Sequence, residues 1–208
     1  KMKNVNDYFD LTNCTAIIAG GASGLGYEMA KGLLSVGCSV AIIGRNQDRV
    51  KESSEILSNI YNRECHGIIC DISSENSLSK MKKEISFLYD NKLNIAINSA
   101  GFNIRNKIED VTLKEWESIQ NVNLTGAFLF ARDSYSLLND SEFGRLINIT
   151  SIFSQVSYPE RVSYSSSKGG LLQLTKTLAV EWAKTNITVN CISPGPFLTE
   201  INKPVLDN

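Results

Sequence analysis

The chain has 208 residues, of which 42% are hydrophobic and 21% charged, and its formal net charge at pH 7 is −1. We expect one globular domain spanning residues 1–208, with neither the basic surface of a nucleic-acid-binding protein nor an apolar run long enough to span a membrane. The five cysteines are an odd number, and three of them lie in or beside apolar runs, so we predict reduced thiols in a cytoplasmic protein.

Apolar, β-rich segments alternate with amphipathic segments along the whole chain. Six apolar segments predict strands, at residues 14–20, 38–44, 65–70, 93–101, 144–150 and 187–193. Helical periodicity between them predicts helices at residues 25–36, 47–61, 75–89, 113–138 and 162–184. The strand segments are continuously apolar, as expected for parallel strands that are covered on both faces. We therefore predict an α/β fold with a doubly wound, mostly parallel sheet.

A glycine-rich stretch, AGGASGLG, joins the first predicted strand to the first predicted helix. Gly20 suits a tight turn, Gly24 lets the backbone approach a pyrophosphate, and Gly26 lets the helix pack close to the sheet. The helix N-terminus then offers free N–H groups and a positive dipole end to the phosphates. We count Ser23 and Leu25 with these glycines as dinucleotide contacts, and an ordinary glycine-rich turn is the alternative.

The end of the second predicted strand bears on the choice of dinucleotide. In such folds an acidic residue at this point binds the ribose 2′-OH of NAD, whereas an arginine accommodates the 2′-phosphate of NADP. Here the strand ends in Gly44, and Arg45 and Asn46 follow. We predict that Arg45 and Asn46 contact the cofactor and that NADP is preferred, with NAD possible; a solvated arginine is the alternative.

The residues around the third predicted strand bear on three possible roles: a metal site, a helix cap and a hydrolase triad. Cys65, His66 and Cys70 lack a fourth ligand at zinc spacing, so we predict no metal site. Asp71 or Ser73 could cap the helix that follows. His66 is the only histidine, and it lies far from any nucleophile elbow, which argues against a Ser-His-Asp hydrolase.

Two Tyr-x-x-x-Lys pairs could each place a phenol and an ammonium one helical turn apart, in YEMAK at 27–31 and YSSSK at 164–168. A lysine beside a tyrosine can lower the phenol pKa from about 10, which suits proton transfer at neutral pH. Only the second pair has a partner, Ser151, at the end of a predicted strand. Because ligands bind outside the carboxyl ends of parallel strands, we predict that Tyr164 and Lys168 are the catalytic pair.

These motifs together resemble the short-chain dehydrogenase/reductase family, whose fold is the Rossmann fold. The resemblance rests on the G-x-x-x-G-x-G spacing, NSAG at 98–101, the asparagine in NVNLTG at 121–126, Ser151, YSSSK and SPGPFLT at 193–199. It implies hydride transfer between a nicotinamide and a carbonyl or secondary alcohol. A non-catalytic NADP(H)-binding regulatory protein is the alternative from a different class. Ala19 and Ser99 depart from the usual motif residues, without touching the proposed chemistry.

The resemblance also implies a role for individual residues. Ser151 would donate to the substrate carbonyl, Tyr164 would donate the proton, Lys168 would also bind the nicotinamide ribose, and Asn123 would hold a water of a proton relay. Asp71 would bind the adenine amine with Ile72 on the ring. The remaining cofactor contacts implied in this way are Asn98, Ala100, Gly101, Pro194, Gly195 and Thr199. The alternative for Asn123 is an interior asparagine that bonds to the backbone.

Segments 102–116 and 193–204 look most like gluconate 5-dehydrogenase-type members, which act on sugar acids and polyols. Arg105 could meet a substrate carboxylate, or it could be a surface arginine. The second candidate substrate is a 3-oxoacyl thioester. Family members usually continue past residue 208 with another helix and strand, so the C-terminal part of the fold is expected to be missing. We expect a homodimer or homotetramer formed through the helices at 113–138 and 162–184.

Overall fold

The computed structural model describes residues 9–197, and within them six strands form one parallel sheet in the order β3-β2-β1-β4-β5-β6. The strands are β1 (Thr15–Ala19), β2 (Ser39–Gly44), β3 (Cys65–Ile69), β4 (Ile95–Asn98), β5 (Gly144–Ile149) and β6 (Ile187–Ile192). Each lies inside a segment predicted as a strand, so the α/β prediction is confirmed. The strand order reverses between β1 and β4, and ligands bind at such a point in open α/β sheets.

The helices follow the predicted pattern with one exception. They are α1 (Gly24–Ser35), α2 (Gln47–Tyr61), α3 (Glu75–Leu88), α4 (Leu113–Gln120), α5 (Gly126–Asn139) and α6 (Val162–Glu181), with short 3₁₀ turns η2 (Ile108–Asp110) and η4 (Ile152–Ser154). The single helix predicted at 113–138 is wrong in one respect, because a π-helical segment, η3 (Asn121–Thr125), separates α4 from α5. Segments of this kind occur often at functional sites.

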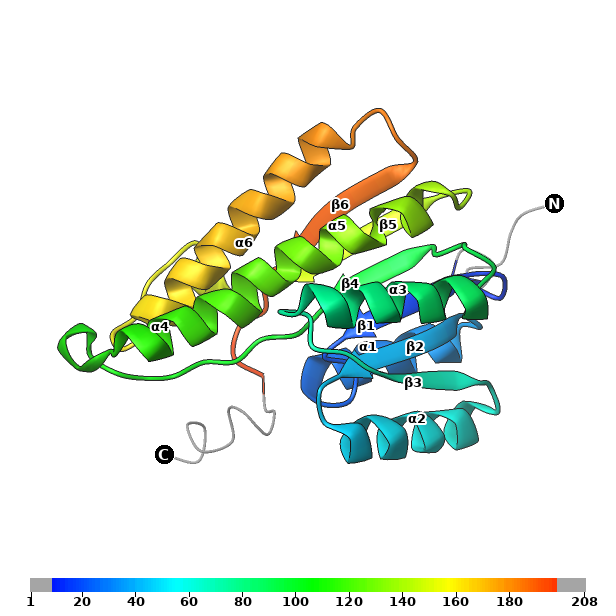
Figure 1. Ribbon diagram of the computed structural model, residues 1–208, viewed down its shortest axis with the longest axis horizontal. Coiled ribbons are helices and arrows are strands. Elements are labelled where there is room, and N and C mark those ends of the chain that lie inside the picture. Colours follow the sequence, from blue (N-terminus) through cyan, green and yellow to red (C-terminus); the bar gives the residue numbers. More distant parts are fainter. Residues whose placement is uncertain (1–8, 198–208) are drawn as a thin grey trace.

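Helices cover both faces of the sheet because successive strand side chains point to opposite faces. In β1, Ile18 packs in the cluster that contains Leu34 of α1 and Leu57 of α2, whereas Ile17 packs in the cluster that contains Phe130 of α5. All five side chains are fully buried. In Figure 1, α3 and α5 lie in front of the sheet and α1 lies behind it.

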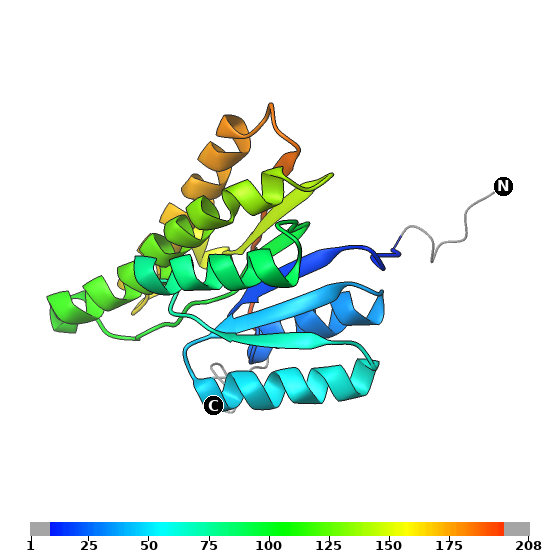
Figure 2. The same ribbon diagram turned by 45° about the vertical axis from the view of Figure 1, so that its right-hand side comes forward.

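The two edges of the sheet carry different helices. Figure 2 shows α2 beside β3 at one edge and α6 beside β6 at the other. α4 packs against α6 and lies beyond the carboxyl ends of the strands, on the left of Figure 1. This arrangement places the start of α6 near the carboxyl ends of the strands, where a ligand is expected. None of the helices within the described residues is long and apolar enough to cross a membrane.

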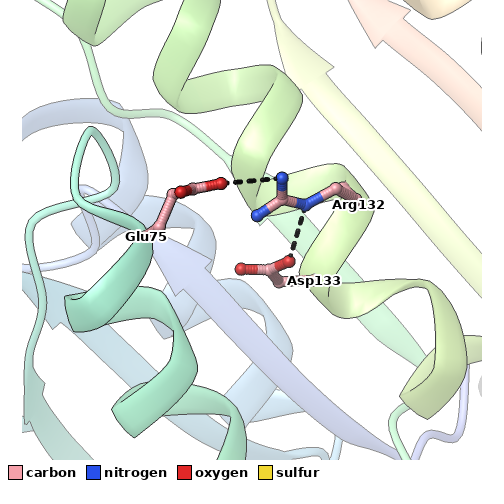
Figure 3. A network of polar contacts seen from close by, with 3 residues as sticks. All are labelled: Glu75, Arg132 and Asp133. Atoms are coloured by element: carbon pink, nitrogen blue, oxygen red, sulfur yellow. Dashed lines mark hydrogen bonds and ion pairs between the residues drawn. The ribbon is translucent and has the colours of Figure 1, made fainter.

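An exposed polar cluster links α3 to α5. Arg132 bonds to Glu75 through Nη1 and to Asp133 through Nε, each at 2.9 Å (Figure 3). The guanidinium also lies 5.7 Å from the centre of the Phe128 ring. Because Arg132 and Glu75 are exposed to water, the ion pair between α3 and α5 adds little stability.

Candidate active site

The glycine loop between β1 and α1 leaves no space for larger side chains. Gly20 and Gly24 have positive φ angles of 73° and 54°, in the region that favours glycine. A Cβ atom on Gly20 would lie 2.9 Å from the backbone nitrogen of Ala100, and one on Gly26 would lie 2.2 Å from the carbonyl oxygen of Gly20. The tight turn predicted at Gly20 is therefore seen in the structure. Gly26 lets α1 approach the glycine loop that precedes it, rather than a strand of the sheet as predicted.

The N-terminus of α1 differs from those of the next three helices. The side chains of Asn46, Ser74 and Thr112 cap α2, α3 and α4 by accepting a hydrogen bond from a backbone N–H in the first turn. Ser23 makes no such bond at α1, whose first turn also contains no acidic residue. The orphan N–H groups of α1 are therefore left available to an anion, which fits the pyrophosphate of a dinucleotide.

A cleft of about 960 Å³ runs along the carboxyl ends of the strands. Most of the predicted site residues border it: Gly20, Ser23, Gly24, Leu25, Arg45, Asn46, Asp71, Ile72, Ala100, Gly101, Ser151, Tyr164, Lys168, Pro194 and Gly195. Gly26, Asn98 and Asn123 do not border it. Thr199 lies outside the described residues. The structure therefore brings together residues that are up to 175 positions apart, from Gly20 to Gly195.

Asn98 supports the wall of the cleft from behind. Its side chain is 1% exposed, and its Oδ1 accepts a hydrogen bond from the backbone of Ala100 at 3.2 Å. The prediction that Asn98 lines the cofactor is corrected to this extent. It fixes the turn after β4, and Ala100 and Gly101 border the cleft in its place.

Asn123 is fully buried in the π-helical segment, where its side chain ties two distant parts of the chain together. Its Oδ1 accepts from the backbone of Phe102, and its Nδ2 donates to the carbonyl of Phe102 and to the hydroxyl of Ser167, at 3.0 to 3.1 Å. The backbone-bonding alternative is thus observed. Both amide hydrogens are committed, so the prediction that Asn123 holds a relay water finds no free side-chain donor.

Ser151, Tyr164 and Lys168 meet at one end of the cleft. Ser151 begins the turn η4 after β5, and Tyr164 and Lys168 lie one helical turn apart at the start of α6. Lys168 is 4% exposed and donates from Nζ to the carbonyl of Ile149 at 2.8 Å. Its Nζ lies 5.8 Å from the centre of the Tyr164 ring. A Cβ on Gly101 would lie 3.5 Å from that Nζ, so the lysine faces the turn after β4.

Burial governs the ionisation of this pair in the structure. It raises the pKa of Tyr164, against the opposing effects of a hydrogen bond with Ser151 and of the Arg161 charge. It also lowers the pKa of Lys168 to about 8. The expected lowering of the phenol pKa by Lys168 is therefore not found, because removal from water disfavours both charged forms. Tyr164 is protonated at neutral pH, as a proton donor must be.

The second Tyr-x-x-x-Lys pair lies outside the cleft. Tyr27 packs against the core cluster beneath α1 and α2, and Lys31 pairs with Glu28 at 2.8 Å. Neither residue borders the cleft. The two pairs have the same sequence spacing and are distinguished by their position in the fold, as predicted from the sequence.

The other end of the cleft is formed by the loops after β2 and β3. Arg45, Asn46 and also Arg49 border it there, and Asn46 accepts from the backbone of Arg49 at 2.9 Å. Asp71 accepts from the backbone and hydroxyl of Ser73. The cap of α3 is Ser74, so the alternative that Asp71 or Ser73 caps this helix is wrong.

Several residues that border the cleft are absent from the sequence predictions. The aromatic ones are Phe102, Phe153, Tyr158 and Phe197, and the charged ones are Arg49 and Arg161. Arg161 is only 9% exposed. A single arginine before a predicted helix gives no signal of burial in the sequence, so this residue could be found only in the fold.

Comparisons with known proteins agree in family and differ in substrate. A family model described as short chain dehydrogenase matches residues 14–208. The chain is 34% identical over 186 residues to a 3-oxoacyl-[acyl-carrier-protein] reductase of Aquifex aeolicus, covering 89% of this chain and 75% of that protein. It is 32% identical to an NAD-dependent glycerol dehydrogenase of Listeria innocua, covering 97% and 77%.

A solved structure from Agrobacterium tumefaciens, described provisionally as a gluconate dehydrogenase, is similar over the same region. It superposes with a TM-score of 0.91 at 29% identity, covering 96% of this chain and 78% of that one. Three relatives at nearly equal identity therefore have three different substrates in their descriptions. The affiliation with gluconate 5-dehydrogenases expected from the sequence is not supported above the others.

Proposed function

This chain belongs to the short-chain dehydrogenase family of NAD(P)-dependent oxidoreductases that act on CH–OH or carbonyl groups. We propose that it transfers a hydride between NADP(H) and a carbonyl or secondary alcohol of a sugar acid or polyol, with NADPH reducing the keto form. The observation that carries the proposal is the meeting of Ser151, Tyr164 and Lys168 in the same cleft as the glycine loop. We further propose that residues 1–208 act as one dinucleotide-binding domain. The five cysteines, all free thiols, support a reducing, cytoplasmic compartment.

The proposed chemistry assigns one task to each side chain. Bound NADPH would supply the hydride. Tyr164, which is protonated at neutral pH and whose pKa burial raises further, donates a proton to the substrate oxygen, and Ser151 donates a hydrogen bond to that oxygen. Lys168 orients the nicotinamide ribose and supports the phenol. The dinucleotide would lie along Gly20–Leu25, Arg45–Asn46, Asp71–Ile72, Ala100–Gly101 and Pro194–Gly195.

The preference for NADP rests on the loop after β2. Gly44 stands where an acidic residue would repel a phosphate, and Arg45 borders the cleft beside it. An arginine can hold a phosphate with two parallel hydrogen bonds. We expect Arg45→Ala to weaken NADP binding by about tenfold or more, with NAD binding nearly unchanged. Calorimetric titration with both cofactors measures the ratio, and an unchanged ratio would show that Arg45 does not select NADP.

The substrate is tested by a carbonyl panel with NADPH. The panel contains 5-ketogluconate, neutral ketoses and an acetoacetyl thioester, because a 3-oxoacyl thioester reductase is the second candidate. Faster NADPH oxidation with 5-ketogluconate supports the sugar-acid proposal, and activity on the thioester alone would contradict it. A regulatory protein would bind NADPH and oxidise it with no member of the panel.

We also propose that the protein assembles as a homodimer or homotetramer through α4, α5 and α6. Large apolar side chains are exposed on each of these helices: Leu113 at 70%, Phe128 at 45% and Val180 at 77%. Burial of such residues against a second copy would remove apolar surface from water.

A further inference from the structure

Arg161 is a buried cation whose side chain has unused hydrogen-bonding capacity. It is 9% exposed, borders the cleft and immediately precedes α6. Its Nη1 donates to the carbonyl of Glu160 at 3.0 Å, and within residues 9–197 its guanidinium makes no other hydrogen bond or ion pair. A guanidinium carries five N–H donors in a fixed fork, so most of its capacity is available to something in the cleft.

A second arginine stands near Arg161 and makes its environment more positive. Arg105, from the loop after β4, borders the same cleft. Burial and the charge of Arg105 lower the pKa of Arg161, whereas Glu160, Tyr158 and Tyr164 act in the opposite direction. Neither arginine forms an ion pair within the described part of the chain. Arg161 is buried and Arg105 is half-buried, and a buried cation beside a second positive charge is unfavourable unless an anion joins them.

We propose that Arg161, assisted by Arg105, binds a carboxylate of the substrate and so makes the enzyme selective for carbonyl compounds that carry an acid group. This inference rests on the proposed reductase function and specifies its substrate. Arg161 lies three residues before Tyr164, so an acid bound there is held close to the carbonyl that accepts the proton. The two oxygens of a carboxylate match the fork of the guanidinium.

The cofactor phosphates do not account for this pair. The pyrophosphate fits the N-terminus of α1, and the 2′-phosphate fits Arg45 after β2, on the other side of β1 from β4 and β5. Arg105 follows β4, and Arg161 follows β5 and precedes the proton donor. A neutral ketone, or a thioester carbonyl with no acid group beside it, would leave Arg161 buried without an anion. An acid substrate is therefore the class that this end of the cleft fits.

The test uses substrate pairs in which one member carries a carboxylate and the other carries a neutral group at the same position. 5-Ketogluconate carries a carboxylate where L-sorbose carries a hydroxymethyl group. Acetoacetate carries a carboxylate where methyl acetoacetate carries an ester. We expect the Arg161→Gln substitution to raise KM for the acids by about tenfold to a hundredfold and to leave KM for the neutral partners within about twofold. Arg161→Lys should recover part of the loss. Arg145→Gln, at the opposite end of β5, is the control and should match the unmodified enzyme.

Gluconate binding gives a readout that does not require turnover. Calorimetric titration of the NADPH complex with gluconate should show binding that Arg161→Gln removes and Arg145→Gln retains. If acid and neutral substrates have equal KM values, or if Arg161→Gln leaves the acid KM and gluconate binding unchanged, the carboxylate site is wrong although reduction can stand. If no carbonyl is reduced, the proposed function is wrong, and gluconate binding alone decides for or against the carboxylate site.

Discussion

At the scale of single residues, Tyr164 and Lys168 form a pair in which removal from water disfavours the charged form of both side chains. Lys168 is buried and Tyr164 half-buried, and the Ser151 hydrogen bond and the Arg161 charge only partly oppose this effect at Tyr164. Burial raises the pKa of the phenol and lowers that of the ammonium to about 8. In the structure the lysine bonds to the carbonyl of Ile149. The site is therefore prepared for a protonated tyrosine, which is the form needed for carbonyl reduction.

Removal of the Tyr164 hydroxyl tests the proton donor. We expect Tyr164→Phe to lower turnover by at least about a hundredfold, because a positioned general acid contributes that much or more. NADPH binding should remain within about twofold. Tyr27→Phe, in the Tyr-x-x-x-Lys pair outside the cleft, should leave turnover nearly unchanged. Steady-state kinetics and a fluorescence titration measure both quantities, and equal behaviour of the two variants would contradict the assignment.

The buried ammonium of Lys168 predicts a pH dependence of stability. The folded protein releases this proton near pH 8, whereas the unfolded chain retains it up to the ordinary value of 10.5. The unfolded state then binds more protons between these values, so stability rises with pH across that window. We expect the wild type to gain up to about 3 kcal/mol relative to Lys168→Met between pH 8 and 10.5. Urea unfolding of both proteins at several pH values measures their free energies of unfolding. A constant difference between wild type and Lys168→Met across this pH range would contradict the prediction.

At the scale of elements, helix α1 is held against the loop that precedes it by a contact that only glycine permits. The helix can approach because Gly26 presents no side chain to the carbonyl of Gly20. Gly32 lies in the same helix, is exposed, and would meet nothing within 4 Å if it carried a Cβ. The two glycines therefore separate the effect of packing from the intrinsic helix preference.

Alanine at these two positions should have opposite effects. Gly26→Ala should destabilise the protein by about 1–3 kcal/mol and weaken NADPH binding, because a methyl group forces the helix away from the phosphate loop. Gly32→Ala should stabilise it by about 0.5–1 kcal/mol, because alanine favours the helix. Thermal unfolding and cofactor titration check both variants. Similar losses at the two positions would contradict the packing argument.

The sequence predicts the elements well where local pattern decides them. Continuous apolar runs locate all six strands, and the glycine spacing locates the cofactor loop. It predicts one helix across 113–138 because the π-helical segment keeps a helical pattern. Within the break, Asn123 bonds to Phe102 and Ser167, and only the fold brings these partners near. The burial of Arg161 and the direction of the Tyr164 pKa shift are tertiary properties for the same reason.

At the scale of the whole molecule, the proposed interface accounts for some of the exposed apolar side chains on the helices but not for all of them. Leu113, Phe128 and Val180 lie on the three helices proposed to form an interface, and Phe87 on α3 is exposed at 88% without belonging to it. Exposed single apolar residues are common on monomers, so exposure alone does not establish an interface. Substitutions at Phe128 and Val180, compared with the same substitution at Phe87, can test whether the interface exists.

A charge on the proposed interface should reduce the size of the assembly. We expect Phe128→Asp and Val180→Asp to shift the protein towards monomer, because a buried unpaired carboxylate is unfavourable. Phe87→Asp, on α3, should leave the assembly intact. Light scattering after size-exclusion chromatography measures the mass. A monomeric wild type, or dissociation by Phe87→Asp alone, would show that α4, α5 and α6 do not form the interface.

The strand order also implies an order in which the two halves of the cleft can form. Strand β1 pairs with β2 through residues close in sequence, such as Thr15 with Ser39, but with β4 through Ala16 and Ile95. Closing the longer loop is entropically harder and slows folding. The half that would hold the adenosine, built from β1, β2 and β3, thus depends on nearby contacts. The half that would hold the reacting carbonyl depends on the long-range pairing of β1 with β4, so it carries the larger entropic cost of loop closure.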